Sequence, residues 1–415
     1  TLPNSHQLGL VTSAIRPWPH QVRVLQRVLE NYPRGMMLCD EVGLGKTIEA
    51  GLILRQLLIS RMVRRALLLV PKSVARQWQE ELYEKFALDV PLYHGGQFTN
   101  YAGETLSPQR ADANPWNRFD VMIASSQLAK RKERHEELVQ AMPWDLIMVD
   151  EAHHARRKDF KERIYRPNRL LSLLVDPRLK ASSVILMTAT PMQVHPLEVW
   201  DLLKVLGMGG KWGADDDYFL YFYEQLRVSN PDEVEWKFVF DMVCDFLEYS
   251  GERNEAFERE GQAKLGPVTW TKVRELPCSS DPAPVVRSLP PEAKAYARRL
   301  AREYTPLRSL MIRNTRDLLR EYVRQGILLQ RVPTRRPQNI WIPMRPEEQN
   351  LYDRIEDYIS NFYNKYEARR KGLGFIMTIY RRRLTSSFHA VRKSLERRYE
   401  FLRGNKHAQL ITDED

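Results

Sequence analysis

Two neighbouring glycines and a lysine–threonine pair stand in the stretch MMLCDEVGLGKTIEAGLIL, residues 36–54. An apolar run, a tight turn and a helix start in this order point backbone N–H groups at a phosphate, with the helix dipole behind them. Gly43 and Gly45 would free the turn. Lys46 would then reach the β- and γ-phosphates of a nucleotide, and the Thr47 hydroxyl would ligate magnesium.

The loop departs from the simplest phosphate-loop pattern at one position. That pattern is glycine, four residues, glycine, lysine and Ser or Thr, and it requires glycine where Asp40 stands. The loop alone therefore leaves two interpretations open, which are a nucleotide site and a glycine-rich turn in an ordinary α/β core.

Acidic residues at a second strand end favour the nucleotide site. In WDLIMVDEAHH, residues 144–154, four apolar residues run directly into Asp150 and Glu151. Open α/β sheets bind their ligands at the carboxyl ends of strands. Asp150 suits the magnesium shell, and Glu151 suits orienting and deprotonating a water. An isolated acidic pair after an apolar run is usually structural, but its place after the lysine loop strengthens the functional interpretation.

A third strand end carries hydroxyl groups. In LMTATP, residues 186–191, Thr188 and Thr190 could sense the state of the acidic pair and relay it to a bound strand. The same composition also makes a plain strand-end turn, so this motif gains weight only from following the other two.

Short apolar runs alternating with helical stretches predict the scaffold for these motifs. Runs that are nearly continuous in apolar residues are typical of strands buried on both faces, and here they lie at 36–39, 66–70, 121–124, 146–149 and 184–187. Helices between such strands give a parallel α/β sheet with helices on both faces. From about Pro196 the pattern becomes mainly helical, and no buried strand is expected before Asn339. We further expect a loop or linker at 276–291, an extended stretch at 331–344, and helices at about 347–370 and 373–402.

Composition indicates a globular protein. The chain has 415 residues, 43% hydrophobic and 28% charged, enough for two or three domains. Its three cysteines are far apart without a CxxC pair, which argues against a zinc knuckle and for a reduced, intracellular protein. We expect no membrane span and no signal peptide. Because the chain starts at Thr1 rather than Met, we interpret it as an excised or processed piece.

The net charge of +11 comes from one segment. Residues 301–400 hold 22 Lys and Arg against 11 Asp and Glu, and the remainder is neutral. This distribution favours a polyanion partner, although a solvated basic surface explains it equally well. Further basic runs at 130–134 and 155–169 have the same two interpretations.

The three motifs, in this order, resemble those of a superfamily-two helicase motor. DEVGLGKTIEAGLIL resembles the Swi/Snf group of double-stranded-nucleic-acid translocases, in which acid–glutamate commonly replaces the first glycine of the loop; the resemblance therefore accounts for Asp40. The DEAH-box sequence DEAHH and TATPMQVHPLEVWDLLKVL resemble the next motifs, and RPWPHQVRVL, residues 16–25, resembles the adenine-reading segment. MIRNTR, residues 311–316, resembles the bacterial RapA-like branch, which includes motors of phage defence.

The resemblance implies a RecA-like fold, ATP and Mg²⁺ as cofactors, and a role for each matching residue. The implied catalytic residues are Lys46, Asp150 and Glu151, with Thr47 and Asp150 on magnesium. ATP would be held by Gln21, which reads adenine, and by Gly43, Leu44, Gly45, Lys46 and Thr47. Coupling would pass through His153, Thr188 and Thr190. Nucleic-acid contact is expected at Lys72, Gln77, Ser125, Ser126 and Lys130.

The same resemblance predicts the domain organisation. Residues 1–200 would form the first RecA-like ATP-binding lobe, 201–345 a helical insertion and return segment, and 346–415 a basic helical connector. The family's second lobe carries an arginine finger and a closing glutamine–arginine motif, and neither occurs before Asp415. We therefore expect the second lobe in the same parent chain or in a partner.

The resulting hypothesis is an ATP-dependent translocase on duplex DNA, ahead of RNA, in a bacterial cytoplasm. Anti-phage defence with further defence subunits is the first setting, and RNA-polymerase recycling by a RapA-like ATPase is the second. A nucleic-acid-binding scaffold with an inactive ATP site is a third alternative. The basic stretch 381–398 is expected to be one helix with an apolar stripe that packs on a neighbour, and that stripe consists of Leu384, Phe388, Val391 and Leu395. Its charges either meet phosphates or only keep a solvated connecting helix soluble.

Overall fold

The structure is a computed structural model of the 415-residue chain. It describes residues 8–160, 165–193, 195–251, 253–329, 332, 334, 338–366 and 373–403. The chain forms two compact units, Thr1–Val332 and Pro333–Asp415, and each is described by itself. Among the described residues, no helix is both long and apolar enough to cross a membrane.

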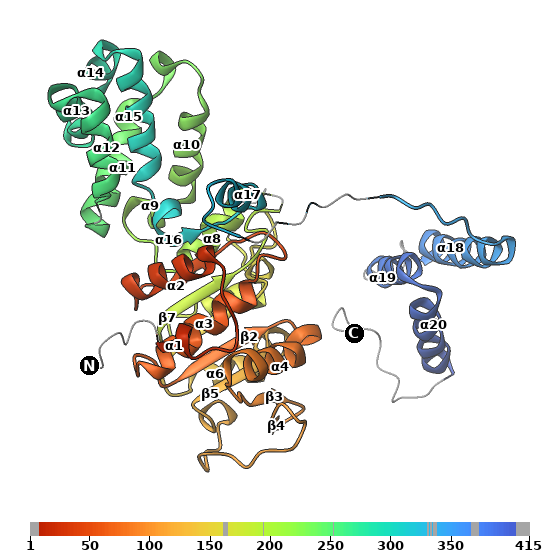
Figure 1. Cartoon of the computed structure of the whole chain (residues 1–415). Coiled ribbons are helices and arrows are strands. Elements are labelled where there is room, and N and C mark those ends of the chain that lie inside the picture. Colours follow the sequence, from red (N-terminus) through yellow and green to blue (C-terminus); the bar gives the residue numbers. More distant parts are fainter. Residues whose placement is uncertain are drawn as a thin grey trace. The chain divides into compact units, whose positions relative to one another are not determined.

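One eight-stranded sheet organises the described part of the first unit (Figure 1). Its strands lie in the order β4-β3-β5-β2-β6-β7-β1-β8, and every neighbouring pair is parallel except β3 with β4. In chain order they are β1 Met36–Leu38, β2 Ala66–Val70, β3 Leu92–His94, β4 Gln97–Thr99, β5 Val121–Ser125, β6 Trp144–Val149, β7 Ala181–Met187 and β8 Met311–Ile312. The predicted RecA-like α/β class is confirmed, including all five predicted strands.

Helices cover both faces of this sheet. Met36 and Leu38 of β1 belong to one apolar cluster, whereas Met37 between them belongs to the other. Because side chains alternate along a strand, burial of all three requires cover on both sides. Two helices precede β1, α1 Leu8–Val11 and α2 Pro19–Asn31. The helices between strands up to β7 are α3 Lys46–Ile59, α4 Ala75–Phe86, α5 Ser126–Ala129, α6 Lys132–Val139 and α7 Arg169–Leu174.

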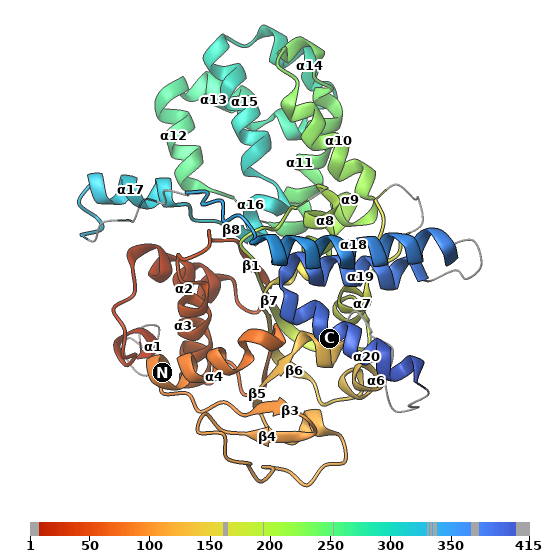
Figure 2. The same cartoon turned by 90° about the vertical axis from the view of Figure 1, so that its right-hand side faces the viewer.

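A helical region follows β7 before the chain returns to the sheet (Figure 2). Its helices are α8 Leu197–Val205, α9 Gly210–Ala214, α10 Asp216–Arg227, α11 Trp236–Ser250, α12 Glu255–Leu265, α13 Pro267–Arg274, α14 Pro282–Ser288, α15 Pro291–Glu303 and α16 Pro306–Leu310. Buried tryptophans tie them together: Trp200 Nε1 donates to the Trp212 carbonyl oxygen and Trp212 Nε1 donates to that of Met242, each over 2.9 Å.

Two predictions for this region were wrong. The expected linker at 276–291 contains α14, whose start is favoured by Pro282, because proline suits the first turn of a helix. The chain also re-enters the sheet as β8, a two-residue strand paired with β1, before α17 Arg316–Arg324. A strand this short leaves almost no periodic pattern in the sequence.

The second unit contains three helices among its described residues, α18 Pro346–Tyr366, α19 Leu373–Ser386 and α20 Phe388–Leu402. The single helix expected at 373–402 is therefore broken at Ser387, whose Oγ accepts a hydrogen bond from the Ala390 N–H and so caps α20. The four residues of the predicted stripe nonetheless pack in one cluster around Tyr380 and Ile359. Residues 338–344 form neither helix nor strand, and the rest of the predicted extended stretch lies largely outside the described residues.

Candidate nucleotide and nucleic-acid site

The loop after β1 has the backbone that a phosphate site requires. Gly43 and Gly45 have φ values of 84° and 93°, which residues with a Cβ rarely adopt. Helix α3 begins directly afterwards at Lys46, as predicted. The Lys46 Nζ donates to the main-chain oxygen of Asp40 over 3.0 Å, so the ammonium group lies against the first residue of the loop.

The Gln21 side chain contacts the backbone of this loop. Its Nε2 donates to the Leu44 carbonyl oxygen over 3.0 Å, and its Oε1 accepts from the Trp18 N–H over 2.8 Å. A Cβ on Gly45 would come within 2.5 Å of the Gln21 Nε2, so this glycine is required by close approach as well as by its φ. The side chain expected to read adenine thus also fixes the loop.

Asp40, the residue that departs from the simple loop pattern, is fully buried and binds a segment far along the chain. Its Oδ1 accepts from the Asn314 N–H over 2.8 Å, and both oxygens face the Asn314 Nδ2 at 3.0 and 2.9 Å. The Glu41 N–H donates back to the Asn314 carbonyl oxygen over 3.2 Å. Arg316 next to it donates to the Val42 carbonyl oxygen. The nucleotide loop is therefore held by the segment that follows β8.

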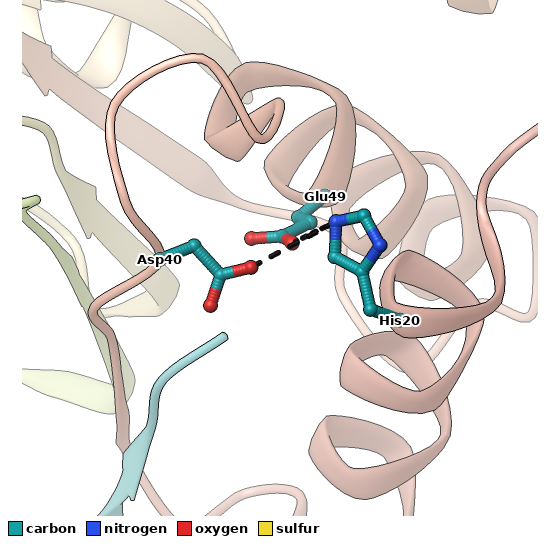
Figure 3. A group of neighbouring side chains, drawn as sticks. All are labelled: His20, Asp40 and Glu49. Carbon is teal, nitrogen blue, oxygen red and sulfur yellow. Dashed lines mark ion pairs between the residues drawn. The ribbon is translucent and has the colours of Figure 1, made fainter. Parts of the chain in front are cut away.

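Asp40 also has two buried ionisable neighbours (Figure 3). The His20 Nε2 lies 3.9 Å from Asp40 Oδ2 and 3.8 Å from Glu49 Oε1. Burial, and then the Asp40 charge, raise the pKa of Glu49 well above its usual range. Burial lowers the pKa of His20. The raised pKa favours the protonated form of the Glu49 carboxyl group.

These three side chains lie close enough together to suggest a metal site, but their hydrogen bonding does not suit one. His20 Nε2, the nitrogen that faces both carboxyl groups, also lies 3.1 Å from the Leu44 carbonyl oxygen. Because that oxygen can only accept, the nitrogen must carry a hydrogen and has no lone pair for a metal. We interpret the cluster as support for the loop.

Asp150 stands at the carboxyl end of β6, as predicted. Its Oδ2 accepts from the Trp78 Nε1 over 2.9 Å, and its Oδ1 accepts from the Glu151 N–H over 2.9 Å. Burial raises the pKa of Asp150, whereas the two donors and the nearby Lys46 ammonium lower it. The two hydrogen-bond donors fix the orientation of this half-buried carboxyl group at the strand end.

A chain of polar contacts joins the acidic motif to β7. The His153 Nδ1 lies 3.1 Å from Glu151 Oε2 and 3.0 Å from Thr188 Oγ1. The Thr190 N–H then donates to the same Thr188 oxygen over 3.2 Å. Burial, followed by the charge of Arg156, lowers the pKa of His153, so the imidazole is neutral at pH 7. The structure thus brings together all of the residues expected to couple the two motifs.

The expected nucleic-acid contacts lie at the carboxyl ends of two adjacent strands, β2 and β5. The Lys72 N–H donates to Gln127 Oε1 over 3.0 Å, which joins the two strand ends. Some of these side chains have local partners: Ser125 Oγ caps α5, Ser126 Oγ donates to Gln127, and the Gln77 amide donates to Glu81. The predicted contact set, which also includes Lys130, stays a prediction.

The basic run 155–169 contains a buried ion-pair network instead of a continuous free surface. Arg157 is only 7% exposed. Its guanidinium donates to both oxygens of Asp201 in α8 and to Asp216 in α10, at 2.6–3.3 Å. At this position the phosphate-contact interpretation was wrong, because the charge is neutralised by carboxylates of the helical region. Residues 161–164 of the run lie outside the described residues.

Sequence reasoning missed several residues of the site. Trp78 was not among the predicted site residues, and its N–H contact with Asp150 spans 72 positions. Asn314 lies 274 positions from Asp40, and Arg316 lies as far from Val42. The only signal for the last two was the motif MIRNTR itself, which carried a resemblance without a role.

The sequence model of the SNF2-related domain matches residues 20–394, which is most of the chain. The chain belongs to this SNF2-related family. The assignment confirms the predicted Swi/Snf-type motor domain and, at the level of the family, its class as an ATP-hydrolysing enzyme of the helicase type.

Relatives of this SNF2-related chain include bacterial proteins. It is 33% identical over 200 residues to the uncharacterized ATP-dependent helicase YqhH of Bacillus subtilis (strain 168), covering 48% of this chain and 31% of the relative. It is 34% identical over 206 residues to the RNA polymerase-associated protein RapA of Yersinia enterocolitica, covering 49% of this chain and 20% of RapA. The match thus spans less than a third of either relative.

A solved structure of similar type is the Sulfolobus solfataricus SWI2/SNF2 ATPase core in complex with dsDNA. It is 16% identical with a TM-score of 0.39, and the match covers 88% of this chain and 57% of that one. A likeness of this size is too weak to carry an argument about ligand or fold, so the RecA-like class rests on the sheet described above.

Proposed function

We propose that this chain is the ATP-binding lobe of a motor that translocates on duplex DNA. The observation that carries the proposal is the contact chain Glu151–His153–Thr188, which joins two strand ends beside the lysine loop. The proposed hydrolytic base Glu151 and the Thr188 hydroxyl share one nitrogen, His153 Nδ1. A change at Glu151 during the ATP cycle would therefore alter the contact of His153 with Thr188. A scaffold with an inactive site would not require this arrangement.

Each side chain has a role in this proposal. Lys46 and the N–H groups of the glycine turn bind the β- and γ-phosphates. Thr47 and Asp150 would hold magnesium, which when bound would supply positive charge beside the phosphates. Glu151 orients and deprotonates the attacking water, and the Gln21 amide recognises adenine. His153, Thr188 and Thr190 couple the loss of the γ-phosphate to a change in the contacts with the nucleic acid.

Duplex DNA, gripped by its backbone without sequence preference, is the proposed track. The proposed contacts are Lys72, Gln77, Ser125, Ser126 and Lys130. In the proposed organisation residues 1–200 form this lobe, 201–345 the insertion and return segment, and 346–415 a connector to a second lobe. Bacterial anti-phage defence is our first proposal for the setting, supported by the resemblance of residues 311–316. The similarity to RapA supports RNA-polymerase recycling as the second.

Two substitutions test the nucleotide site. Lys46→Ala should abolish ATP binding, because the loop loses its cation, whereas Glu151→Gln should retain binding and stop hydrolysis. Nucleotide binding by calorimetry and phosphate release, with the second lobe and duplex DNA supplied, separate the two effects. Equal ATP affinity in the unaltered chain and in Lys46→Ala would refute the assignment.

A further inference from the structure

A cavity of about 370 Å³ lies where the helical region meets the end of β8. No residue of the nucleotide loop lines it. Its walls come from α10, α15, α16 and the residue after β8, and their polar side chains are Tyr223, Arg227, Arg302, Thr305, Arg308 and Arg313. Four of these six carry a guanidinium group, and no carboxylate is among the described residues that line the cavity.

Most of this positive charge is uncompensated. Arg308 lies 3.5 Å from Glu303. Arg227, Arg302 and Arg313 are exposed, and the structure gives their side chains no hydrogen bond or ion pair with any described residue. Like charges that converge on one cavity repel one another, and a bound anion relieves that repulsion while accepting charge-assisted hydrogen bonds.

Local structural roles explain only part of the cluster. Arg227 and Arg302 each lie in the last turn of a helix, where a cation complements the helix dipole. Arg313 follows a strand and has no such role. The helix dipole also does not explain why arginines from three helices and one strand end line the same cavity without an acidic residue among them.

The cavity shares part of its lining with a neighbouring cavity that begins directly after the TATP motif. A second cavity of about 250 Å³ shares Tyr223, Arg227 and Arg313 and extends to Pro191 and Met192, directly after the TATP threonines. Arg313 also precedes Asn314, which binds Asp40 in the nucleotide loop. A ligand here would therefore touch segments attached to both β7 and the loop.

We propose that Arg227, Arg302 and Arg313 form a phosphate-binding site, and that its ligand is the backbone of the nucleic acid on which the motor acts. The choice of ligand rests on the proposed function; the site itself does not. Guanidinium groups bind phosphate oxygens in a bidentate manner, and successive phosphates of one strand satisfy several arginines at once. The helical region then extends the nucleic-acid path beyond the strand ends of β2 and β5.

The test compares two double variants with the same change in charge. Arg227→Gln with Arg302→Gln removes two cations from the cavity. The control, Arg259→Gln with Arg274→Gln, removes two exposed cations from another cavity of the same helical region, where Glu255 and Glu258 neutralise them. Binding of a short fluorescein-labelled duplex to the full chain is measured by anisotropy over a salt series, without nucleotide.

The cavity variant should bind duplex more weakly, with the slope of log affinity against log salt reduced by roughly 0.9 for each phosphate that the variant no longer binds. The control should keep the slope of the unaltered chain. Equal slopes in all three proteins, or equal reductions in both variants, would overturn the site. If the unaltered chain binds no duplex at all, the proposed track fails instead, so the two failures are distinguishable.

A second probe identifies the source of the phosphate. Binding of inorganic tripolyphosphate is measured by calorimetry on Lys46→Ala, in which the nucleotide loop is disabled, with and without the cavity substitutions. Loss of tripolyphosphate binding together with a reduced duplex slope supports the proposal. Loss of tripolyphosphate binding with an unchanged duplex slope would overturn the nucleic-acid ligand and assign the cavity to a free polyphosphate.

Discussion

An exchange of amide and carboxylate between Asp40 and Asn314 tests whether the segment after β8 holds the nucleotide loop. Asp40 is fully buried and Asn314 is 8% exposed, and the Asn314 Nδ2 donates to both carboxylate oxygens. Truncation by Asn314→Ala removes one charge-assisted donor and should lower the free energy of unfolding by about 1.5–3 kcal/mol.

Asn314→Asp should cost more than the alanine substitution. It places a second carboxyl group against Asp40 in a buried place, where two like charges cannot both persist. The double variant Asp40→Asn with Asn314→Asp restores an amide facing a carboxylate and keeps an oxygen at position 40 for the backbone N–H of residue 314. We therefore expect a coupling energy of about 1.5–3 kcal/mol between the two substitutions, near the upper end for residues in contact.

Urea unfolding followed by tryptophan fluorescence measures these free energies, because eight of the nine tryptophans lie in the first unit. ATP affinity is measured in parallel and should fall in Asn314→Asp and recover in the exchange. Asn100 and Glu104 provide the matched control, since their amide and carboxylate also pair, over 2.8 Å, but at an exposed position. Their exchange should show a coupling below about 0.5 kcal/mol.

A coupling energy at the buried pair no larger than that at the exposed control would refute this reasoning. Recovery of stability without recovery of ATP affinity would show that the contact supports the fold but not the loop. Either result would remove the structural explanation offered here for an aspartate in place of the loop's first glycine.

Three further predictions concern other parts of the chain. Glu49→Gln should increase the free energy of unfolding at neutral pH, because the raised pKa of Glu49 makes the folded state hold a proton that the unfolded state releases. This gain in stability should vanish below the usual Glu pKa of about 4.3. A gain that is independent of pH in paired urea titrations would contradict the prediction. Trp78→Phe removes the N–H donor to Asp150 and should raise the magnesium concentration needed for ATP binding, whereas an unchanged magnesium titration would exclude this role. In the second unit, alanine should replace Arg392, Lys393 and Arg397 together. The slope of log affinity for duplex against log salt should then fall by roughly 0.9 for each phosphate no longer bound. Unchanged affinity and slope would show that the segment is structural.

The parts of the fold that were predicted are those whose pattern is local. β2, ALLLV, is buried along its whole length, so the apolar run alone marks it. β8 has two residues and exists because Met37 and Leu38 of β1 offer a free edge to Met311 and Ile312, which is information from another part of the chain. The break at Ser387 likewise depends on one hydroxyl that caps a helix inside an otherwise continuous apolar stripe.

The candidate site divides in the same way. Asp150 and Thr188 follow apolar runs directly, and Lys46 follows the glycine turn after such a run, so these local patterns identified them without knowledge of the fold. Trp78 and Asn314 act on residues 72 and 274 positions away, and nothing in their own neighbourhood shows which atoms they meet.

Asp40 shows how these two kinds of information meet in one residue. A glycine at this position would leave the Asn314 amide buried without its carboxylate, and a buried unpaired polar group costs about 1–3 kcal/mol. The aspartate is therefore matched to a segment that arrives only after the helices of residues 197–310. The same segment contributes Arg313 to the lining of the arginine-lined cavity and Arg316 as a donor to the Val42 carbonyl oxygen of the loop. Only a few residues of backbone therefore separate the cavity lining from the contacts that hold the nucleotide loop. The departure from the simplest loop pattern is thus the point at which the segment after β8 is hydrogen-bonded to the lysine loop.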